Sequence, residues 1–405
     1  MGKTILMIGT FDTKGEEYAF VRDIIHARGH ETLALHTGVF DADPNVHVDV
    51  SNGDVAQVGG TPIGELQDKK DRGEAMKVMS AGAAVVVRKL YEDGRFDGAI
   101  GLGGTGGTSV ITTGLRSLPL GVPKVMVSTA ASGDTSIYVG TRDIAMFPSV
   151  VDVAGVNRIS RQIFTRAAGA ICGMVESVPE ASADEKPIIA ASMFGNTTEC
   201  VDRCREALTE KGYEVLVFHA TGTGGKTMES LVDDGLVKAC LDITTTEWAD
   251  EICDGVFSAG PTRLDAPGKA GIPHLIVPGC IDMANYGPRD TVPAKYDDRL
   301  LYEWNPSVTL MRTNADENRQ MGEIFAEKAN AATGPVAALI PLKGVSILDG
   351  EGEMFCDRDA DQAMFDALKS NLRDDIEVVE IDCNINDEAF STKAVEMMLD
   401  LIYKK

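Results

Sequence analysis

The chain has 405 residues, of which 44% are hydrophobic and 25% charged, and its formal net charge is −24. The composition is that of a soluble globular protein, and the length predicts two domains. The negative charge repels nucleic acid and anionic lipid, and no apolar run reaches the ~20 residues that span a membrane, so we expect no nucleic-acid or membrane partner. Because neither a signal-peptide layout nor a CxxC pair is present, we expect a cytoplasmic protein.

Residues 1–183 are expected to form the first domain. The segment 38–64 is rich in Asp, Gly and Val and lacks helical periodicity, so we expect it to be an excursion or lid. Apolar runs predict strands, and amphipathic periodicity predicts helices. The strands are expected at 4–8, 31–36, 96–100 and 124–128, and the helices at 16–28, 72–92, 108–115 and 157–176.

The second domain is expected to cover residues 184–405, because the stretch 177–186 (SVPEASADEK) reads as a linker. Short apolar strands again alternate with amphipathic helices, which predicts an α/β fold of two Rossmann-like doubly wound domains with mainly parallel sheets. Strands are expected at 188–193, 213–219, 255–258, 274–277, 336–340 and 377–381, and helices at 200–211, 317–332, 359–372 and 387–403.

The most informative motif is GLGGTGGTS at 101–109, between a predicted strand and a predicted helix. Such a loop exposes backbone N–H groups beside the positive end of a helix, so it can bind a phosphate or another anion. The alternative is a tight turn required by the packing of strand and helix. The candidate binding residues are Gly103, Gly104, Thr105, Gly106, Gly107 and Thr108.

Two other polar loops follow predicted strands, and the carboxyl ends of parallel strands are where such sheets bind ligands. In GTFDTKG, Asp12 could contact a ribose or a metal and Lys14 a phosphate, whereas Asp12 or Thr13 could instead cap the following helix. The TAASGDTS loop either faces the same crevice or caps itself. From these loops we take Thr10, Asp12, Thr13, Lys14, Ser132, Gly133, Asp134 and Thr135 as candidate nucleotide-binding residues.

A second glycine loop, ATGTGGKT at 220–227, satisfies a relaxed phosphate-loop pattern. In that interpretation Gly224, Gly225 and Lys226 belong to the nucleotide site: Lys226 would reach the β/γ phosphates, and Thr227 would hold Mg²⁺. In the alternative, the glycines only cap the following helix. His219 ends a predicted strand and Asp282 lies in the segment PGCIDM after another, and each is either an acid–base group or a hydrogen-bonded loop residue. The sequence assigns no catalytic residue, metal ligand or reaction.

Several blocks occur in one order along the chain: GTFDTKGEE, GLGGTGGTS, ASGDTSIYVG, NRISR, FHATGTGGKTME, TTTEWADE, GVFSAGPTRL and VTLMRTN. They resemble a family of largely uncharacterised bacterial and fungal proteins that includes the amino-terminal domain of the plant tomato mosaic virus resistance protein. The resemblance implies two Rossmann-like subdomains, ATP binding with Mg²⁺, and self-association into a dimer or a larger homo-oligomer. Our own assignment of the ATP is to the loops at 10–14 and 103–108, with 132–135 as a third wall.

We therefore expect a nucleotide-binding protein with ATP–Mg²⁺ in an interdomain cleft at the strand carboxyl ends. The first hypothesis is an enzyme in which ATP activates a small acid substrate. The second is a non-catalytic regulatory or protein-binding module that responds to the nucleotide. A third, an NAD(P)-dependent oxidoreductase, has less support because the glycine loop at 101–109 is not a GxGxxG motif followed about twenty residues later by an acidic residue.

Overall fold

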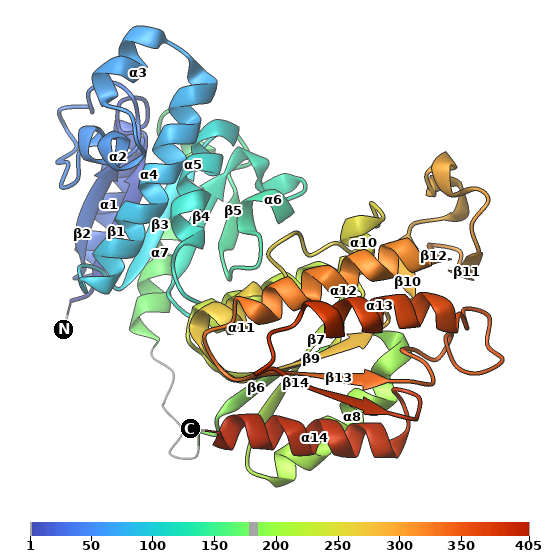
Figure 1. Ribbon diagram of the computed structural model, residues 1–405. Coiled ribbons are helices and arrows are strands. Elements are labelled where there is room, and N and C mark those ends of the chain that lie inside the picture. Colours follow the sequence, from blue (N-terminus) through green and yellow to red (C-terminus); the bar gives the residue numbers. More distant parts are fainter. Residues whose placement is uncertain (1, 178–184, 405) are drawn as a thin grey trace. The chain divides into compact units, whose positions relative to one another are not determined.

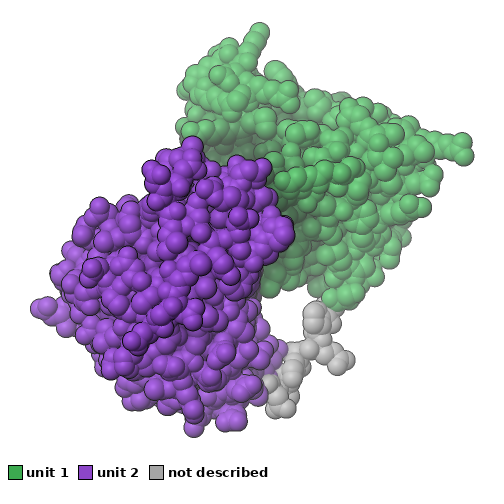
Figure 2. Space-filling view, turned by 90° about the vertical axis from the view of Figure 1, so that its right-hand side faces the viewer, with its two compact units in different colours: residues 1–181 green, residues 182–405 purple. Residues whose placement is uncertain are grey.

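The computed structural model describes residues 2–177 and 185–404, which form two compact units, 1–181 and 182–405 (Figures 1 and 2). The expected domain boundary at residue 183 lies outside the described residues. Each unit is an α/β layer structure with a parallel sheet between helices, so the predicted fold class is confirmed. No helix within the described ranges combines the length and apolar character needed to cross a membrane.

The first unit contains a five-stranded parallel sheet in the order β2-β1-β3-β4-β5. The chain winds one way from β1 to β2 and the other way from β3 onward, so the strand order reverses between β1 and β3. This reversal opens a crevice at the carboxyl ends of the two strands, where such sheets bind ligands. The strands are β1 (Thr4–Gly9), β2 (Glu31–His36), β3 (Gly98–Gly103), β4 (Lys124–Ser128) and β5 (Ala145–Pro148).

Helices cover both faces of this sheet because alternate residues of a strand point to opposite sides. On β1, Ile5 and Met7 pack with α1 and α7, whereas Leu6 and Ile8 pack with α2, α3, α4 and α5. The helices are α1 (Gly15–Ala27), α2 (Asn52–Val58), α3 (Ile63–Lys69), α4 (Arg72–Glu92), α5 (Thr105–Arg116), α6 (Ser136–Val139) and α7 (Arg158–Glu176), with a 3-10 turn η1 (Thr129–Ser132).

The second unit repeats this order with one more strand, as β14-β13-β9-β8-β6-β7, all parallel. A small antiparallel sheet, β10-β12-β11, follows the carboxyl end of β9. The parallel strands are β6 (Ile188–Met193), β7 (Glu214–His219), β8 (Val237–Thr244), β9 (His274–Gly279), β13 (Val336–Pro341) and β14 (Glu377–Ile381); the antiparallel ones are β10 (Met283–Tyr286), β11 (Leu301–Asn305) and β12 (Val308–Arg312).

Two helix layers cover the six-stranded sheet. One core packs α8 and α14 against one face, and α12 and α13 lie side by side on the other (Figure 1). The helices are α8 (Thr198–Glu210), α9 (Thr223–Asp233), α10 (Glu247–Ile252), α11 (Asp265–Ala270), α12 (Ala315–Asn330), α13 (Arg358–Asn371) and α14 (Glu388–Tyr403), with 3-10 turns η2 (Gly195–Thr197), η3 (Arg289–Thr291) and η4 (Ala294–Tyr296).

Some expected elements differ from the structure. The strand expected at 255–258 is wrong, because these residues form the turn after α10, and the segment 38–64 contains α2. Strand β8 is not predicted from the sequence, because Lys238 and Asp242 interrupt its apolar run. The short strands β5, β10, β11 and β12 are not predicted either. β3 starts later than expected and extends through the first glycines of GLGGTGGTS, so the loop before α5 is a single tight turn.

Candidate functional site

A cavity of about 480 Å³ lies at the carboxyl ends of β1, β2 and β3, at the point where the strand order of the first unit reverses. It is lined by the loops after β1 and β2, the start of α5, part of α3 and the start of α4. Its volume falls within the ~300–1,000 Å³ range of small-molecule sites. The cavity brings together two loops that were expected to bind a nucleotide, 10–14 and 103–108, through Thr10, Asp12, Thr13, Gly106 and Gly107.

The amino terminus of α5 presents open hydrogen-bond donors to this cavity. Its N-cap residue, Gly104, carries no capping side chain, and the helix ladder starts only with the Thr108 amide, which donates to the Gly104 carbonyl at 2.8 Å. The amides of Thr105, Gly106 and Gly107 therefore make no hydrogen bond to the described part of the protein. Uncapped amides and the helix dipole together attract an anion.

Arg72 adds a positive charge beside these amides. A β-carbon at position 106 would lie 3.0 Å from Nη2 of Arg72, so the guanidinium reaches the first turn of α5. Across the described ranges, Arg72 takes part in no ion pair or side-chain hydrogen bond. A cation left without a protein partner at the edge of a cavity can pair with an anionic ligand.

Two buried oxygen atoms at the cavity also lack partners. Thr37, which directly follows β2, is 3% exposed, yet its Oγ1 makes no hydrogen bond to any described residue. Asp12 accepts a hydrogen bond from the Phe40 amide on Oδ2 at 3.2 Å, whereas its Oδ1 is buried without a partner. Buried polar atoms are rarely left unsatisfied, so these two point to a water or a ligand in the cavity.

The remaining wall of the cavity is apolar. Side chains from the loop after β2, from α3 and from α4 line it: Val39, Phe40, Leu66, Ala75, Met76 and Met79. An apolar wall facing a few convergent polar groups is the usual architecture of a site for a flat organic ligand. Methionine suits this role because its thioether adapts to the ligand and makes favourable contacts with aromatic rings.

Other candidate residues from the sequence lie elsewhere. Lys14 is the N-cap of α1 and does not line the cavity, and the Thr108 hydroxyl turns inward to Ser128 Oγ at 2.6 Å. Gly103 ends β3. Ser132 lines a separate cavity, which Gly133, Asp134 and Thr135 do not line. The Asp134 carboxylate accepts a hydrogen bond from the Ser136 amide at 2.9 Å, and hydrogen bonds from the Ser136 side chain and from this amide lower the pKa of Asp134.

The second glycine loop is occupied by the protein itself. One carboxylate oxygen of Glu247 accepts hydrogen bonds from the amides of Gly222 at 2.8 Å and Gly225 at 3.1 Å. A β-carbon at position 225 would fall 2.2 Å from the other oxygen of Glu247, so glycine is needed here to admit the carboxylate. Lys226 is exposed. The loop thus has the capping geometry that was the alternative to a phosphate loop.

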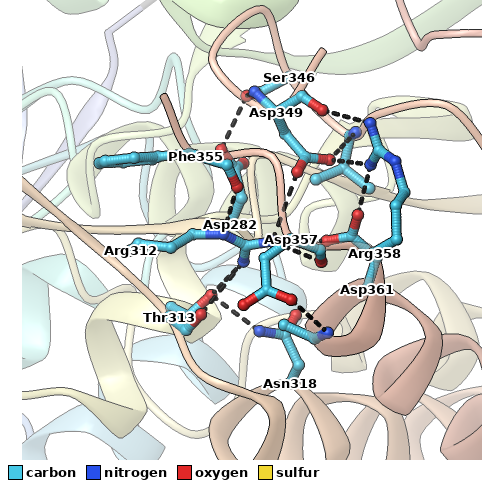
Figure 3. A network of polar contacts seen from close by, with 12 residues as sticks. Asp282, Arg312, Thr313, Asn318, Ser346, Asp349, Phe355, Asp357, Arg358 and Asp361 are labelled. Carbon is cyan, nitrogen blue, oxygen red and sulfur yellow. Dashed lines mark hydrogen bonds and ion pairs between the residues drawn. The ribbon is translucent and has the colours of Figure 1, made fainter. Parts of the chain in front are cut away.

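Asp282, a candidate acid–base group, lies in a buried charge network at the carboxyl ends of β9 and β13 (Figure 3). Its Oδ2 accepts a hydrogen bond from Ser346 Oγ at 2.8 Å, and its buried Oδ1 finds no partner among the residues that the structure describes. Burial raises the pKa of Asp282 to about 6, although Arg312 nearby lowers it. His219, the other candidate, is exposed and stacks on Phe194, with ring centroids 5.4 Å apart.

Arg312 holds this network together. Its guanidinium donates to Asp361 at 2.7 Å, to Asp349 at 3.4 Å and to the carbonyl of Phe355 at 2.7 Å (Figure 3). Burial and the neighbouring Asp349 raise the pKa of Asp361 to about 7. The Arg312 donors are all directed at protein acceptors, and the network joins β12, α13 and the loop after β13.

The described ranges contain no group of three or more His, Cys, Asp and Glu side chains arranged to hold a metal ion. Asp12 is still compatible with Mg²⁺, because Mg²⁺ in nucleotide sites binds through one or two carboxylates together with phosphates and water. Arg72 and Thr37 line the cavity but are not among the residues predicted from the sequence. The position of Thr37 after a predicted strand was a usable signal, whereas the approach of Arg72 to α5 depends on tertiary packing.

Two family models together match most of the chain. The amino-terminal domain of an uncharacterised protein family, UPF0261, matches residues 3–180, and the carboxyl-terminal domain of that family matches residues 186–402. A UPF0261 protein of Clostridium tetani is 47% identical over 405 residues, covering 100% of both chains. The tomato ToMV resistance protein Tm-1(GCR237) is 37% identical over 423 residues, which cover 98% of this chain and 55% of the tomato protein.

Similarity to solved structures is distant. The glycosyltransferase SnogD from Streptomyces nogalater aligns over 98% of this chain and 100% of its own, with 12% identity and a TM-score of 0.21. MurG from Acinetobacter baumannii aligns over 98% of this chain and 99% of its own, with 12% identity and a TM-score of 0.22. Resemblance at this level identifies no shared activity.

Proposed function

We propose that this chain, which belongs to the uncharacterised protein family UPF0261, binds ATP or a closely related nucleotide in the cavity at the carboxyl ends of β1, β2 and β3. The observation that carries the proposal is the convergence of open donors and unpartnered acceptors in one cavity. The open amides belong to the first turn of α5, and the unpartnered acceptors are Asp12 Oδ1 and Thr37 Oγ1.

The phosphates would bind at the amino terminus of α5. The open amides of Gly106 and Gly107 would donate hydrogen bonds to phosphate oxygens, and Arg72 would supply a positive charge beside them. The absence of a β-carbon at these glycines lets phosphate oxygens approach the backbone closely. Charge-assisted hydrogen bonds of this kind are roughly twice as strong as those between neutral groups.

The sugar and the base have matching surfaces in the same cavity. The Thr37 hydroxyl and the free Asp12 oxygen can satisfy ribose hydroxyls, whose donors are what these two atoms lack. The apolar wall around Met76 and Met79 can contact the faces of a base. Asp12 could instead bind a Mg²⁺ that accompanies the phosphates, since one carboxylate oxygen suffices for that role.

Calorimetric titration of the full-length protein with ATP–Mg²⁺, ADP, adenosine and NAD⁺ tests the proposal. The informative variant is Gly107→Leu, because a β-carbon at position 107 meets nothing within 4 Å and the side chain would enter the cavity. The matched control is Gly173→Leu on α7, where a β-carbon also meets nothing within 4 Å. Circular dichroism and urea unfolding confirm that both variants fold.

Each outcome of the titration bears on the proposal. We expect ATP to bind the wild type and Gly173→Leu with equal affinity, and Gly107→Leu to bind it at least 10-fold more weakly. If the folded Gly107→Leu variant bound ATP with the same affinity as the wild type, the nucleotide would not bind in this cavity. Binding of NAD⁺ without binding of ATP would replace the proposal with the oxidoreductase hypothesis.

A further inference from the structure

A second cavity, of about 410 Å³, lies on the other flank of the α5 amino terminus, at the carboxyl ends of β3, β4 and β5. It is formed by the start of α5, the turn η1 after β4, and the segment that follows β5. The lining residues are Gly104, Thr105, Thr129, Ser132, Ser149, Val150, Val151 and Asp152. The nucleotide proposal leaves this cavity without a ligand.

Most of the polar side chains that line this second cavity are hydroxyl groups of Ser and Thr. The side chains of Thr105, Thr129 and Ser132 form no hydrogen bond to the described residues, so their donors and acceptors are available to a ligand. Asp152 is the single ionisable side chain in the lining, and no Lys, Arg or His is among these residues. A carboxylate therefore meets no cationic side chain in this cavity and is repelled by Asp152, whereas a neutral compound with several hydroxyl groups matches the lining.

The two cavities share one helix turn. Gly104 and Thr105 line the second cavity, whereas Gly106 and Gly107 line the first. A helix rises about 1.5 Å per residue, so these four residues follow one another within about 5 Å along the axis. A phosphoryl group held by the α5 amides would therefore lie within reach of ligands in both cavities.

We propose that the second cavity is the acceptor site for phosphoryl transfer from the nucleotide to a neutral polyhydroxyl compound such as a sugar or polyol. This inference rests on the proposed function. An acceptor hydroxyl oxygen attacks the terminal phosphorus of ATP, and the bond from that phosphorus to the bridging oxygen breaks, releasing ADP. The proton of the hydroxyl passes to the Asp152 carboxylate and then to water, and the uncapped α5 amides stabilise the charge on the transferring group.

The substrate class differs from the small acid expected from the sequence. In the second glycine loop the amides of Gly222 and Gly225 bind Glu247, whereas the amides of the first turn of α5 are open, and in this proposal the phosphoryl group occupies them. What remains for the acceptor is the hydroxyl-lined surface from Thr129 to Asp152.

The test measures ADP release by the full-length protein with ATP–Mg²⁺ and single acceptors: glucose, ribose, glycerol and myo-inositol as neutral polyols, and gluconate as a matched acid. Calorimetry measures ATP binding separately. The variant is Asp152→Asn, and its control is Asp134→Asn, an exposed acid on the same edge that does not line the cavity. We expect one of the polyols to stimulate ADP release, and Asp152→Asn to lower the stimulated rate at least 100-fold with unchanged ATP affinity.

Other outcomes would overturn the inference. ATP binding without stimulation by any of the four polyols would reject the acceptor site and leave the nucleotide proposal standing. Stimulation by gluconate alone would reject the neutral substrate class. A stimulated rate that is unchanged in Asp152→Asn would reject the role of that carboxylate, and failure of the wild type to bind ATP would overturn both proposals.

Discussion

Glu247 and Arg263 form a buried ion pair in the second unit, with Oε2 and Nε 2.7 Å apart. The other carboxylate oxygen of Glu247 caps the amides of Gly222 and Gly225. The glycine loop that resembles a phosphate loop therefore already holds a negative charge, supplied by a residue of α10 and fixed by Arg263. A phosphate would have to displace this carboxylate and leave Arg263 with one fewer partner in the interior, at a cost of several kcal/mol.

This occupied loop gives the first prediction. Lys226→Ala should leave the affinity for ATP–Mg²⁺ within 2-fold of the wild-type value, because Lys226 is exposed and the neighbouring amides bind Glu247. The measurement is the same calorimetric titration used for the nucleotide cavity. A 10-fold or larger loss of affinity in the folded variant would restore the phosphate-loop interpretation of ATGTGGKT.

The unpartnered hydroxyl of Thr37 gives a prediction with opposite signs for stability and binding. Thr37→Val keeps the shape of the side chain and removes a buried oxygen that has no hydrogen bond in the described protein. Without ligand, the free energy of unfolding in urea should stay equal or rise by about 1 kcal/mol, because an unsatisfied buried polar group is removed. The affinity of the variant for ATP–Mg²⁺ should fall by about 5-fold or more, because the variant loses one hydrogen bond to the nucleotide.

A matched control separates these effects. Thr313→Val removes a buried hydroxyl of the second unit that donates to the Ile281 carbonyl at 2.7 Å, so this variant should lose stability while ATP affinity stays unchanged. If Thr37→Val loses stability as Thr313→Val does, and binds ATP normally, the Thr37 hydroxyl has a structural partner and no ligand role.

Burial of Asp282 predicts a pH dependence of stability. An aspartate in an unfolded chain has a pKa near 3.9, whereas in the folded protein burial raises the pKa of Asp282 to about 6. Between these values the folded state binds more protons than the unfolded state. Asp282 therefore makes the free energy of unfolding fall as pH rises from about 4 to 6, by up to about 1.4 kcal/mol per pH unit. Above about pH 6 it contributes no further change.

Urea unfolding of the wild type and of Asp282→Asn between pH 4 and 8 measures this contribution. The difference in unfolding free energy between the variant and the wild type should increase from pH 4 to 6 in favour of the variant and then stay constant. Asp400→Asn, at an exposed position of α14, is the control and should follow the wild type. Parallel curves for Asp282→Asn and the wild type would show that Asp282 titrates like an exposed aspartate.

The sequence predicts the fold well because its signal is local. Apolar runs and amphipathic periodicity identify most strands and helices, and glycines between strand and helix identify the turn before α5. Elements with mixed composition are the ones missed: in β8, Lys238 and Asp242 interrupt the pattern, and Asp242 is buried only because Arg263 and His274 bind it. Those partners lie more than twenty residues away, and no local pattern reveals them.

The candidate site shows the same division. GLGGTGGTS and ATGTGGKT look alike, but the first follows β3, in the interior of its sheet, and the second follows β7, at an edge. The two loops differ because Glu247, which is distant in sequence, binds amides of the second loop and leaves those of the first loop open. The positions of Thr10, Asp12 and Thr13 follow from strand ends alone, whereas the approach of Arg72 to α5 requires the packing of α4 against α5.

The most direct test of the central claim is an amide NMR titration of glycine-labelled full-length protein with ATP–Mg²⁺, with single Gly→Ala variants used for assignment. The account predicts saturable shifts of the Gly106 and Gly107 amides, at the same midpoint as the calorimetric binding curve, while the amides of Gly222 and Gly225 keep their positions. Saturable shifts confined to Gly222 and Gly225, or ATP binding that moves none of these amides, would contradict it.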